Sequence, residues 1–131
     1  MSSVRHEPTS AADAQDALER TAGVGIIRTP LVRLNAPESP VEIFLKLENL
    51  QPIGSFKIRG MANALAQADA AGLAKGVWTV SAGNAAKGLA WSARRLGVAC
   101  AAVVPESAPE AKLAAIERLG ARIIEVHSTS G

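Results

Sequence analysis

Short apolar runs alternate with longer amphipathic stretches over the second half of the chain. The runs lack helical spacing, which is typical of strands buried in a parallel sheet, and they occupy residues 77–80, 98–104 and 122–126. The stretches between them are rich in Ala and Leu, which predicts helices over 85–96 and from Ser107 or Ala108 to Leu119. A glycine follows each stretch, as it does at many helix ends.

The first half of the chain has a less regular pattern. Thr9 or Ser10 can cap a helix over about 11–22. Partial alternation of apolar and polar residues over 41–47 predicts a strand, and the composition from about 56 to 70 predicts a helix that begins near Ser55. Residues 1–10 are mostly polar and are predicted to form a flexible tail.

Strands that alternate with helices predict the fold class. The expected fold is α/β, a parallel sheet with crossover helices in a three-layer αβα arrangement. The last predicted strand ends near residue 126, where a fold of this kind places another helix. We therefore expect the chain to be the N-terminal fragment of a longer protein.

Composition and charge argue against several classes of partner. Hydrophobic residues make up 48% of the chain and the mean hydropathy is +0.16, so the chain can bury a core. Aromatic residues make up 3%, too few for a nucleic-acid stacking platform, and the 14 basic and 12 acidic residues are interspersed. No apolar stretch is long enough to span a bilayer. We expect a cytoplasmic protein with no nucleic-acid or membrane partner and no metal site.

Lys57 is the first candidate for chemistry. In the first turn of a helix it would face the positive end of the helix dipole, which disfavours an ammonium ion. Burial would favour the neutral amine further, and a neutral amine can form an imine with a carbonyl compound. The alternative is a solvated lysine near a helix start, as most lysines are solvated.

The loop Ser81-Ala82-Gly83-Asn84 is the second candidate. Its small residues let backbone N–H groups converge at a helix N-terminus, which suits an anion such as a carboxylate. Ser81 and Asn84 can add side-chain hydrogen bonds. The alternative is an ordinary helix cap, for which Ser, Gly and Asn are common. Lys87, one turn beyond Asn84, is expected to point to solvent.

Four strings of residues, taken together, resemble the threonine/serine dehydratase family of pyridoxal-phosphate enzymes, which is tryptophan-synthase-β-like and has fold type II. They are Thr29-Pro30-Leu31, Lys46-Leu47-Glu48-Asn49-Leu50-Gln51-Pro52, Gly54-Ser55-Phe56-Lys57-Ile58-Arg59-Gly60 and Thr79-Val80-Ser81-Ala82-Gly83-Asn84. The resemblance runs in order from about residue 27 to 126. It implies pyridoxal 5'-phosphate as cofactor, a small amino acid as substrate and a homo-oligomer when full-length. It also implies that residues 11–75 are the N-terminal part of a large cofactor-binding domain and that 76–131 begin a small, truncated α/β domain.

The resemblance also assigns roles to the candidate residues. Lys57 would be the Schiff-base lysine and would then shuttle protons, while Phe56 would lie against the pyridine ring. Asn84 would hydrogen-bond the phenolic oxygen of the cofactor, and the loop of Ser81, Ala82, Gly83 and Asn84 would hold the substrate carboxylate. The implied reaction is dehydration and deamination of L-threonine or L-serine to a 2-oxo acid and ammonia.

Departures from the family pattern leave alternatives open. The family usually reads Asn-His-Ala-Gln-Gly where this chain has Asn84-Ala85-Ala86-Lys87-Gly88, which leaves the exact substrate undecided. Related serine racemases carry a second Ser where this chain has Ala82, and this difference favours a dehydratase. The remaining alternatives are a serine racemase, another β-elimination or β-replacement enzyme of the group, or a non-catalytic truncated remnant. The family's glycine-rich phosphate loop and its Ser or Cys near the pyridine nitrogen are absent, so we expect the chain alone to be inactive.

Overall fold

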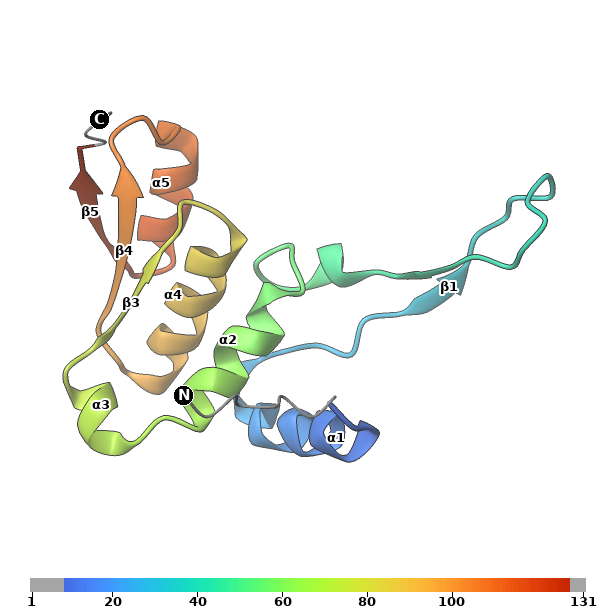
Figure 1. The fold of residues 1–131 in the computed structure, drawn as a ribbon, viewed down its shortest axis with the longest axis horizontal. Coiled ribbons are helices and arrows are strands. Elements are labelled where there is room, and N and C mark those ends of the chain that lie inside the picture. The colour runs from blue at the N-terminus through green and yellow to red at the C-terminus, as the bar shows by residue number, and fades with distance from the viewer. Residues whose placement is uncertain (1–8, 128–131) are drawn as a thin grey trace, which may run out of the picture.

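The computed structural model describes residues 9–127 and consists of an α/β body from which a hairpin projects (Figure 1). Its elements are α1 (Ala11–Arg20), η1 (Ala22–Val24), β1 (Leu31–Arg33), β2 (Phe44–Lys46), η2 (Glu48–Leu50), α2 (Lys57–Ala66), α3 (Ala70–Ala74), β3 (Val77–Val80), α4 (Asn84–Leu96), β4 (Cys100–Pro105), α5 (Glu110–Arg118) and β5 (Arg122–Val126).

A parallel sheet in the order β3-β4-β5 forms the second half of the fold. Helices α4 and α5 connect consecutive strands, and buried residues of both helices pack on β4 in one core. Ala90, Ala102, Val104 and Ile116 are fully buried there. Parallel strands joined through helices that pack on the sheet confirm the predicted α/β fold with crossover helices.

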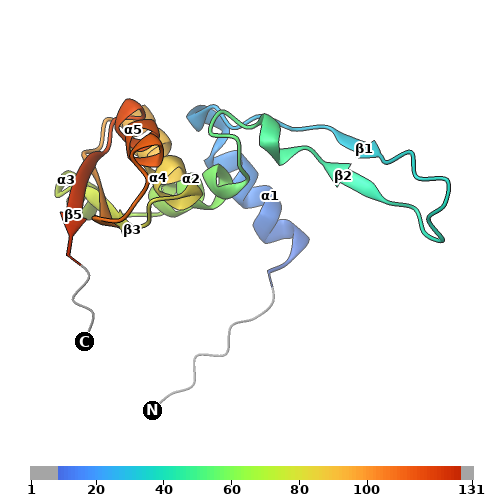
Figure 2. The same cartoon turned by 90° about the horizontal axis from the view of Figure 1, so that it is seen from above.

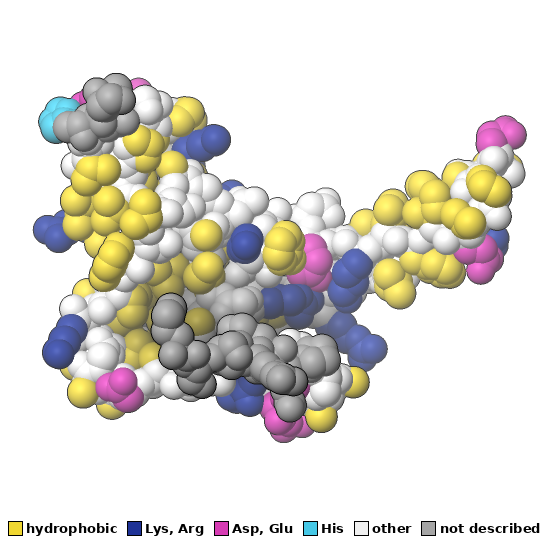
Figure 3. Space-filling model, in the orientation of Figure 1, with side chains coloured by type: hydrophobic (Ala, Val, Ile, Leu, Met, Phe, Trp, Pro, Cys, Tyr) yellow, Lys and Arg dark blue, Asp and Glu magenta, His cyan; other side chains and the backbone are white. Residues whose placement is uncertain are grey.

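The opposite face of the sheet carries exposed apolar side chains. Trp78 is 68% exposed and Val80 is 70% exposed, and both belong to β3. Figure 3 shows hydrophobic side chains gathered over this part of the molecule and along the projecting hairpin. Among the described residues, the helices that pack on the sheet therefore cover only one face.

The segment predicted as a strand over 41–47 does not join the parallel sheet. Its strand is shorter, β2, and it pairs antiparallel with β1, with Leu31 opposite Lys46 and Arg33 opposite Phe44. The two strands form a hairpin that extends away from the body (Figure 2). The prolines between them permit a local turn, and pairing with a neighbour in sequence has a low loop-closure cost. The assumption that all strands alternate with helices was wrong at this point.

The helix predicted over 56–70 is shorter in the structure, where it is α2, and a separate short helix, α3, follows it. Helix α2 ends at Ala66, and Asp69 then caps α3 by accepting a hydrogen bond of 2.7 Å from the Gly72 amide. The aspartate offers the backbone a new helix start, which composition alone does not reveal. The predicted first helix is confirmed, with Ser10 as its cap and Asp13 completing a capping box.

Candidate cofactor site

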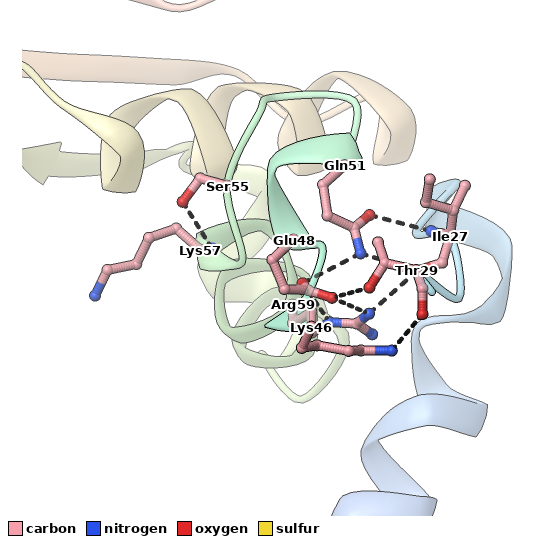
Figure 4. A network of polar contacts seen from close by, with 8 residues as sticks. All are labelled: Ile27, Thr29, Lys46, Glu48, Gln51, Ser55, Lys57 and Arg59. Carbon is pink, nitrogen blue, oxygen red and sulfur yellow. Dashed lines mark hydrogen bonds and ion pairs between the residues drawn. The ribbon is translucent and has the colours of Figure 1, made fainter. Parts of the chain in front are cut away.

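Lys57 is the first residue of α2, and its side chain is exposed. Its backbone N–H donates to the hydroxyl oxygen of buried Ser55 at 3.3 Å, and its Nζ lies 5.4 Å from the centre of the Phe56 ring. Figure 4 shows the amine extending away from the polar network behind it. The exposed side chain matches the alternative of a solvated lysine near a helix start. The next residue, Ile58, faces the core instead, because successive helical positions point about 100° apart.

Arg59 and Glu48 form a bidentate ion pair on the side of α2 away from the Lys57 amine (Figure 4). The Arg59 Nη2 is 2.8 Å from Glu48 Oε1, and the Arg59 Nε donates to Glu48 Oε2 at 2.8 Å. Thr29 and Gln51 also donate side-chain hydrogen bonds to this carboxylate. The Arg59 guanidinium, helped by Thr29, holds the pKa of Glu48 at about 2 although burial acts in the opposite direction.

The same network fastens the segment around Thr29 to the start of α2. Gln51 accepts from the Ile27 amide and donates to the Ile27 carbonyl at 2.8 Å, and Lys46 Nζ donates to the Thr29 carbonyl at 2.6 Å. Arg59 adds a hydrogen bond to the Ile27 carbonyl. The Glu48–Arg59 pair was not predicted from the sequence, although two opposite charges in neighbouring strings were an available signal.

The Ser81–Asn84 loop connects the carboxyl end of β3 to the N-terminus of α4. The Gly83 N–H donates to the Ser81 hydroxyl oxygen at 3.1 Å, and Gly83 is the N-cap residue of α4. Because glycine has no side chain, the cap makes no side-chain hydrogen bond, and Asn84 is exposed at the first helical position. Ala82 and Gly83 are half-buried. The loop thus presents backbone N–H groups and the Asn84 amide at a helix start.

The packing of α2 on α4 brings the two candidate loops together. A methyl group built on Gly88 would lie 3.1 Å from the Lys57 carbonyl oxygen and 3.2 Å from its carbonyl carbon. Asn84 precedes Gly88 by one helical turn and lies on the same side of α4. The structure therefore places the Ser81–Asn84 loop about one turn from the point at which α4 contacts Lys57.

Lys87 was expected to point to solvent, and this prediction is wrong. The residue is half-buried, and its Nζ donates to the Ile53 carbonyl oxygen at 3.3 Å. It also lines a hollow of about 410 Å³ together with Ala82, Gly83, Asn84 and the α5 residue Lys112. The lysine turns toward the loop that leads to Lys57 because Ile53 offers a carbonyl without a backbone partner in a helix or strand.

The remaining candidate groups do not form a second site. No group of three or more His, Cys, Asp and Glu residues that could bind a metal ion occurs within residues 9–127. In the same stretch, no helix has both the length and the apolar character needed to cross a membrane. Cys100 is half-buried, and burial raises the pKa of its thiol.

Comparison with known proteins identifies the class to which this fold and site belong. The family described as pyridoxal-phosphate dependent enzyme matches residues 23–131. The chain belongs to this family and is built on fold type II. Its relatives in the family depend on pyridoxal phosphate.

Particular members of the family are similar to the chain. The mitochondrial threonine dehydratase of Schizosaccharomyces pombe is 44% identical over 101 residues, which are 76% of this chain and 17% of the relative. The catabolic L-threonine dehydratase of Staphylococcus aureus is 42% identical over 76% of this chain and 30% of its own length. The crystal structure of serine racemase from Dictyostelium discoideum superposes with a TM-score of 0.83 and 37% identity, covering 91% of this chain and 39% of that chain. The chain thus spans less than a third of the two curated relatives.

The residues at the site fit the family's cofactor. Among the described residues no ion pair engages Lys57, so its exposed amine is accessible to an aldehyde. The adjacent Phe56 ring is 59% exposed and offers a flat apolar surface to an aromatic ring. Asn84 adds an exposed amide that can donate to an oxygen of the cofactor. An amine, an aromatic face and an amide donor at one end of two packed helices match the chemistry of pyridoxal phosphate.

Proposed function

We propose that the protein to which this chain belongs dehydrates and deaminates L-threonine or L-serine to a 2-oxo acid and ammonia, with Lys57 as the lysine that binds the cofactor. The observation that carries the proposal is the contact of the Lys57 backbone with α4, one turn beyond Asn84. This contact joins the exposed amine to the loop that presents helix N–H groups. The threonine dehydratases similar to this chain support the reaction class.

Each candidate residue has a distinct task in this proposal. The Nζ of Lys57 would hold the cofactor covalently. Once the substrate amine has displaced it, the free Lys57 amine would take the α-proton and pass a proton to the β-hydroxyl, which would leave as water. The Phe56 ring would pack against the cofactor ring, and the Asn84 amide would donate to its phenolic oxygen. When bound, pyridoxal phosphate supplies an electron-withdrawing ring that makes the α-proton acidic.

The Ser81–Asn84 loop is proposed to bind the substrate carboxylate. Backbone N–H groups at the start of α4 lie at the positive end of a helix of 13 residues, which favours an anion. The Ser81 hydroxyl accepts from the Gly83 amide, and this hydrogen bond leaves the hydroxyl proton available to a carboxylate oxygen. Binding there would place the α-carbon of the substrate toward Lys57.

Ala82 is the observation that favours a dehydratase over a racemase. A racemase needs a second proton-transfer group on the opposite side of the α-carbon from the lysine, and the methyl group of Ala82 cannot exchange a proton. The alternatives are a serine racemase, another β-elimination or β-replacement enzyme, and a remnant without activity. The similarity to a serine racemase structure keeps the first alternative in view.

The wider organisation of the protein is part of the same proposal. We infer that residues 11–75 belong to a large cofactor-binding domain, that 76–131 begin a small domain, and that the full-length protein is a homo-oligomer acting in amino-acid metabolism. The exposed apolar side chains of β1, β2 and β3 support this inference, because other parts of the full-length protein or a second subunit could pack on them. That the protein has no nucleic-acid or membrane partner and is cytoplasmic stays a prediction. Its relatives include a mitochondrial enzyme.

Borohydride reduction of the complete protein loaded with pyridoxal phosphate tests the proposal. Peptide mapping is expected to find the reduced pyridoxyl mark on Lys57, and the active protein is expected to form 2-oxobutanoate from L-threonine. A mark on Lys57 without that product would retain the cofactor site and reject the reaction. A protein that binds the cofactor without a mark on Lys57 would refute the central claim.

A further inference from the structure

Helices α2 and α4 approach each other closely at Gly88. The position where a Cβ would stand on Gly88 is 3.1 Å from the Lys57 carbonyl oxygen and 3.2 Å from the Lys57 carbonyl carbon. The same position is 3.2 Å from the Met61 Cγ, one turn further along α2. Unstrained contacts between carbon atoms lie near 3.5–4.0 Å. A methyl group at Gly88 would therefore push against the backbone of Lys57, which cannot rotate away.

The reason for a glycine at this position is space and not backbone conformation. Gly88 lies inside α4 and is not among the glycines with positive φ. A glycine inside a helix lowers helix stability by about 1 kcal/mol relative to alanine. The close packing of α4 on Lys57, which only glycine permits, offsets this loss. Gly60 in α2 provides the contrast: apart from its chain neighbours and its own helix backbone, no atom of residues 9–127 lies within 4 Å of the position of its Cβ.

Lys87 makes a second contact between α4 and the chain before Lys57. Its Nζ donates to the Ile53 carbonyl oxygen, four residues before Lys57. Between these two contact points, Ser55 accepts a hydrogen bond from the Lys57 backbone N–H. Helix α4 thus touches the peptide that presents Lys57 at both of its ends.

We propose that Lys87 and Gly88 are positioning residues that fix the Lys57 backbone against α4 and so set the place of its amine relative to the Ser81–Asn84 loop. The inference rests on the proposed function of Lys57. Because a misplacement of about 1 Å can slow a reaction about a hundredfold, a displaced Lys57 would react more slowly with the cofactor aldehyde while the fold stays intact.

The test measures how fast Lys57 is marked by pyridoxal phosphate and borohydride in the complete protein, with Lys75 as the internal reference. Gly88→Ala and Lys87→Ala are each expected to slow marking of Lys57 at least about fivefold, a change equivalent to one lost hydrogen bond. Marking of Lys75 is expected to stay constant. Lys87→Gln, which keeps a donor on the side chain, is expected to restore part of the loss.

The pH midpoint of the cofactor absorbance band is a second readout. It is expected to move in Gly88→Ala and Lys87→Ala, which a purely structural role would not predict.

Matched controls separate positioning from general damage. In Gly60→Ala and Lys112→Ala, Lys57 is expected to be marked at the wild-type rate. The added methyl group at Gly60 meets open space, and Lys112 is an exposed lysine that lines the same hollow as Lys87. If Gly88→Ala does not fold, Lys87→Ala decides the question, since alanine is a strong helix former. If Gly88→Ala and Lys87→Ala fold and their Lys57 is marked as fast as in the wild type, the inference is overturned. A wild-type protein with no mark on Lys57 would instead refute the proposed function.

Discussion

Arg59 holds both carboxylate oxygens of Glu48, with two nitrogen–oxygen distances of 2.8 Å. Glu48 belongs to the string before Lys57 and Arg59 to the string that contains Lys57, and the side chains of Arg59 and Glu48 are only 34% and 17% exposed. A pair of this geometry is stronger than a surface ion pair because its donors are fixed and partly shielded from water. It connects the start of α2, and with it Lys57, to the segment around Thr29.

Replacing Glu48 by glutamine is expected to destabilise the chain by about 2 kcal/mol, since the partly shielded Arg59 charge loses its counter-ion. Urea unfolding at low protein concentration would measure the change. Glu42→Gln provides the matched control, because Glu42 pairs with Arg33 at a site where both side chains are more than 60% exposed. That change is expected to stay within about 0.5 kcal/mol. Equal effects of the two substitutions would contradict this role of the Glu48–Arg59 pair.

Glu48 also predicts how stability depends on pH. Its pKa falls from 4.5 to about 2 in the folded chain, chiefly through Arg59. Between these two values the unfolded chain binds more protons, so stability from this group is fully present above pH 4.5 and is lost as the pH falls toward 2. The stability difference between wild type and Glu48→Gln is expected to shrink over that window. A difference that remains constant from pH 5 to pH 2 would rule out this contribution.

Lys57→Ala is expected to remove the pyridoxyl mark and to reduce threonine deamination by at least about a thousandfold, because the lysine both binds the cofactor and moves the proton. The stability of the fold is expected to stay within about 0.5 kcal/mol, since the side chain is exposed. Lys75→Ala is the control for loss of a surface lysine. Retained activity in Lys57→Ala would exclude Lys57 from the reaction.

Ala82→Ser is expected to introduce racemisation of L-serine. The new hydroxyl could exchange a proton with the face of the α-carbon opposite Lys57, and a positioned acid or base contributes at least about a hundredfold. Chiral chromatography would measure D-serine against 2-oxo acid, and a rise of at least tenfold in that ratio is expected. Ala85→Ser adds a hydroxyl one residue beyond the loop and serves as the control. An unchanged ratio in Ala82→Ser would remove Ala82 as the argument against a racemase.

The 131-residue chain alone is expected to bind pyridoxal phosphate weakly and to self-associate. Leu31, Phe44, Trp78 and Val80 are each more than half exposed, and apolar surface of this kind promotes association. Size-exclusion chromatography with light scattering, together with the cofactor absorbance band, would test both expectations. A single monomeric species with a cooperative melt and a full-strength cofactor band would contradict them.

Most of the second half of the fold could be predicted from the sequence. The runs at 77–80, 98–104 and 122–126 correspond closely to β3, β4 and β5, and the stretches between them correspond to α4 and α5. These elements were predictable because a buried parallel strand needs a continuous apolar run and a crossover helix must follow it. The first half was less predictable, since a hairpin and a capped break after Ala66 depend on pairings that periodicity does not encode.

The sequence by itself determined the order of strands and helices in the second half of the chain and the two loops that carry the candidate residues. The strings around Lys57 and Asn84 indicated the family. The tertiary structure alone decided that Lys57 is exposed, that Arg59 pairs with Glu48 and that Gly88 contacts the Lys57 backbone. Local patterns are set by each residue's neighbours along the chain. Exposure and close approach depend on which helices pack together, and that is fixed only when distant segments meet.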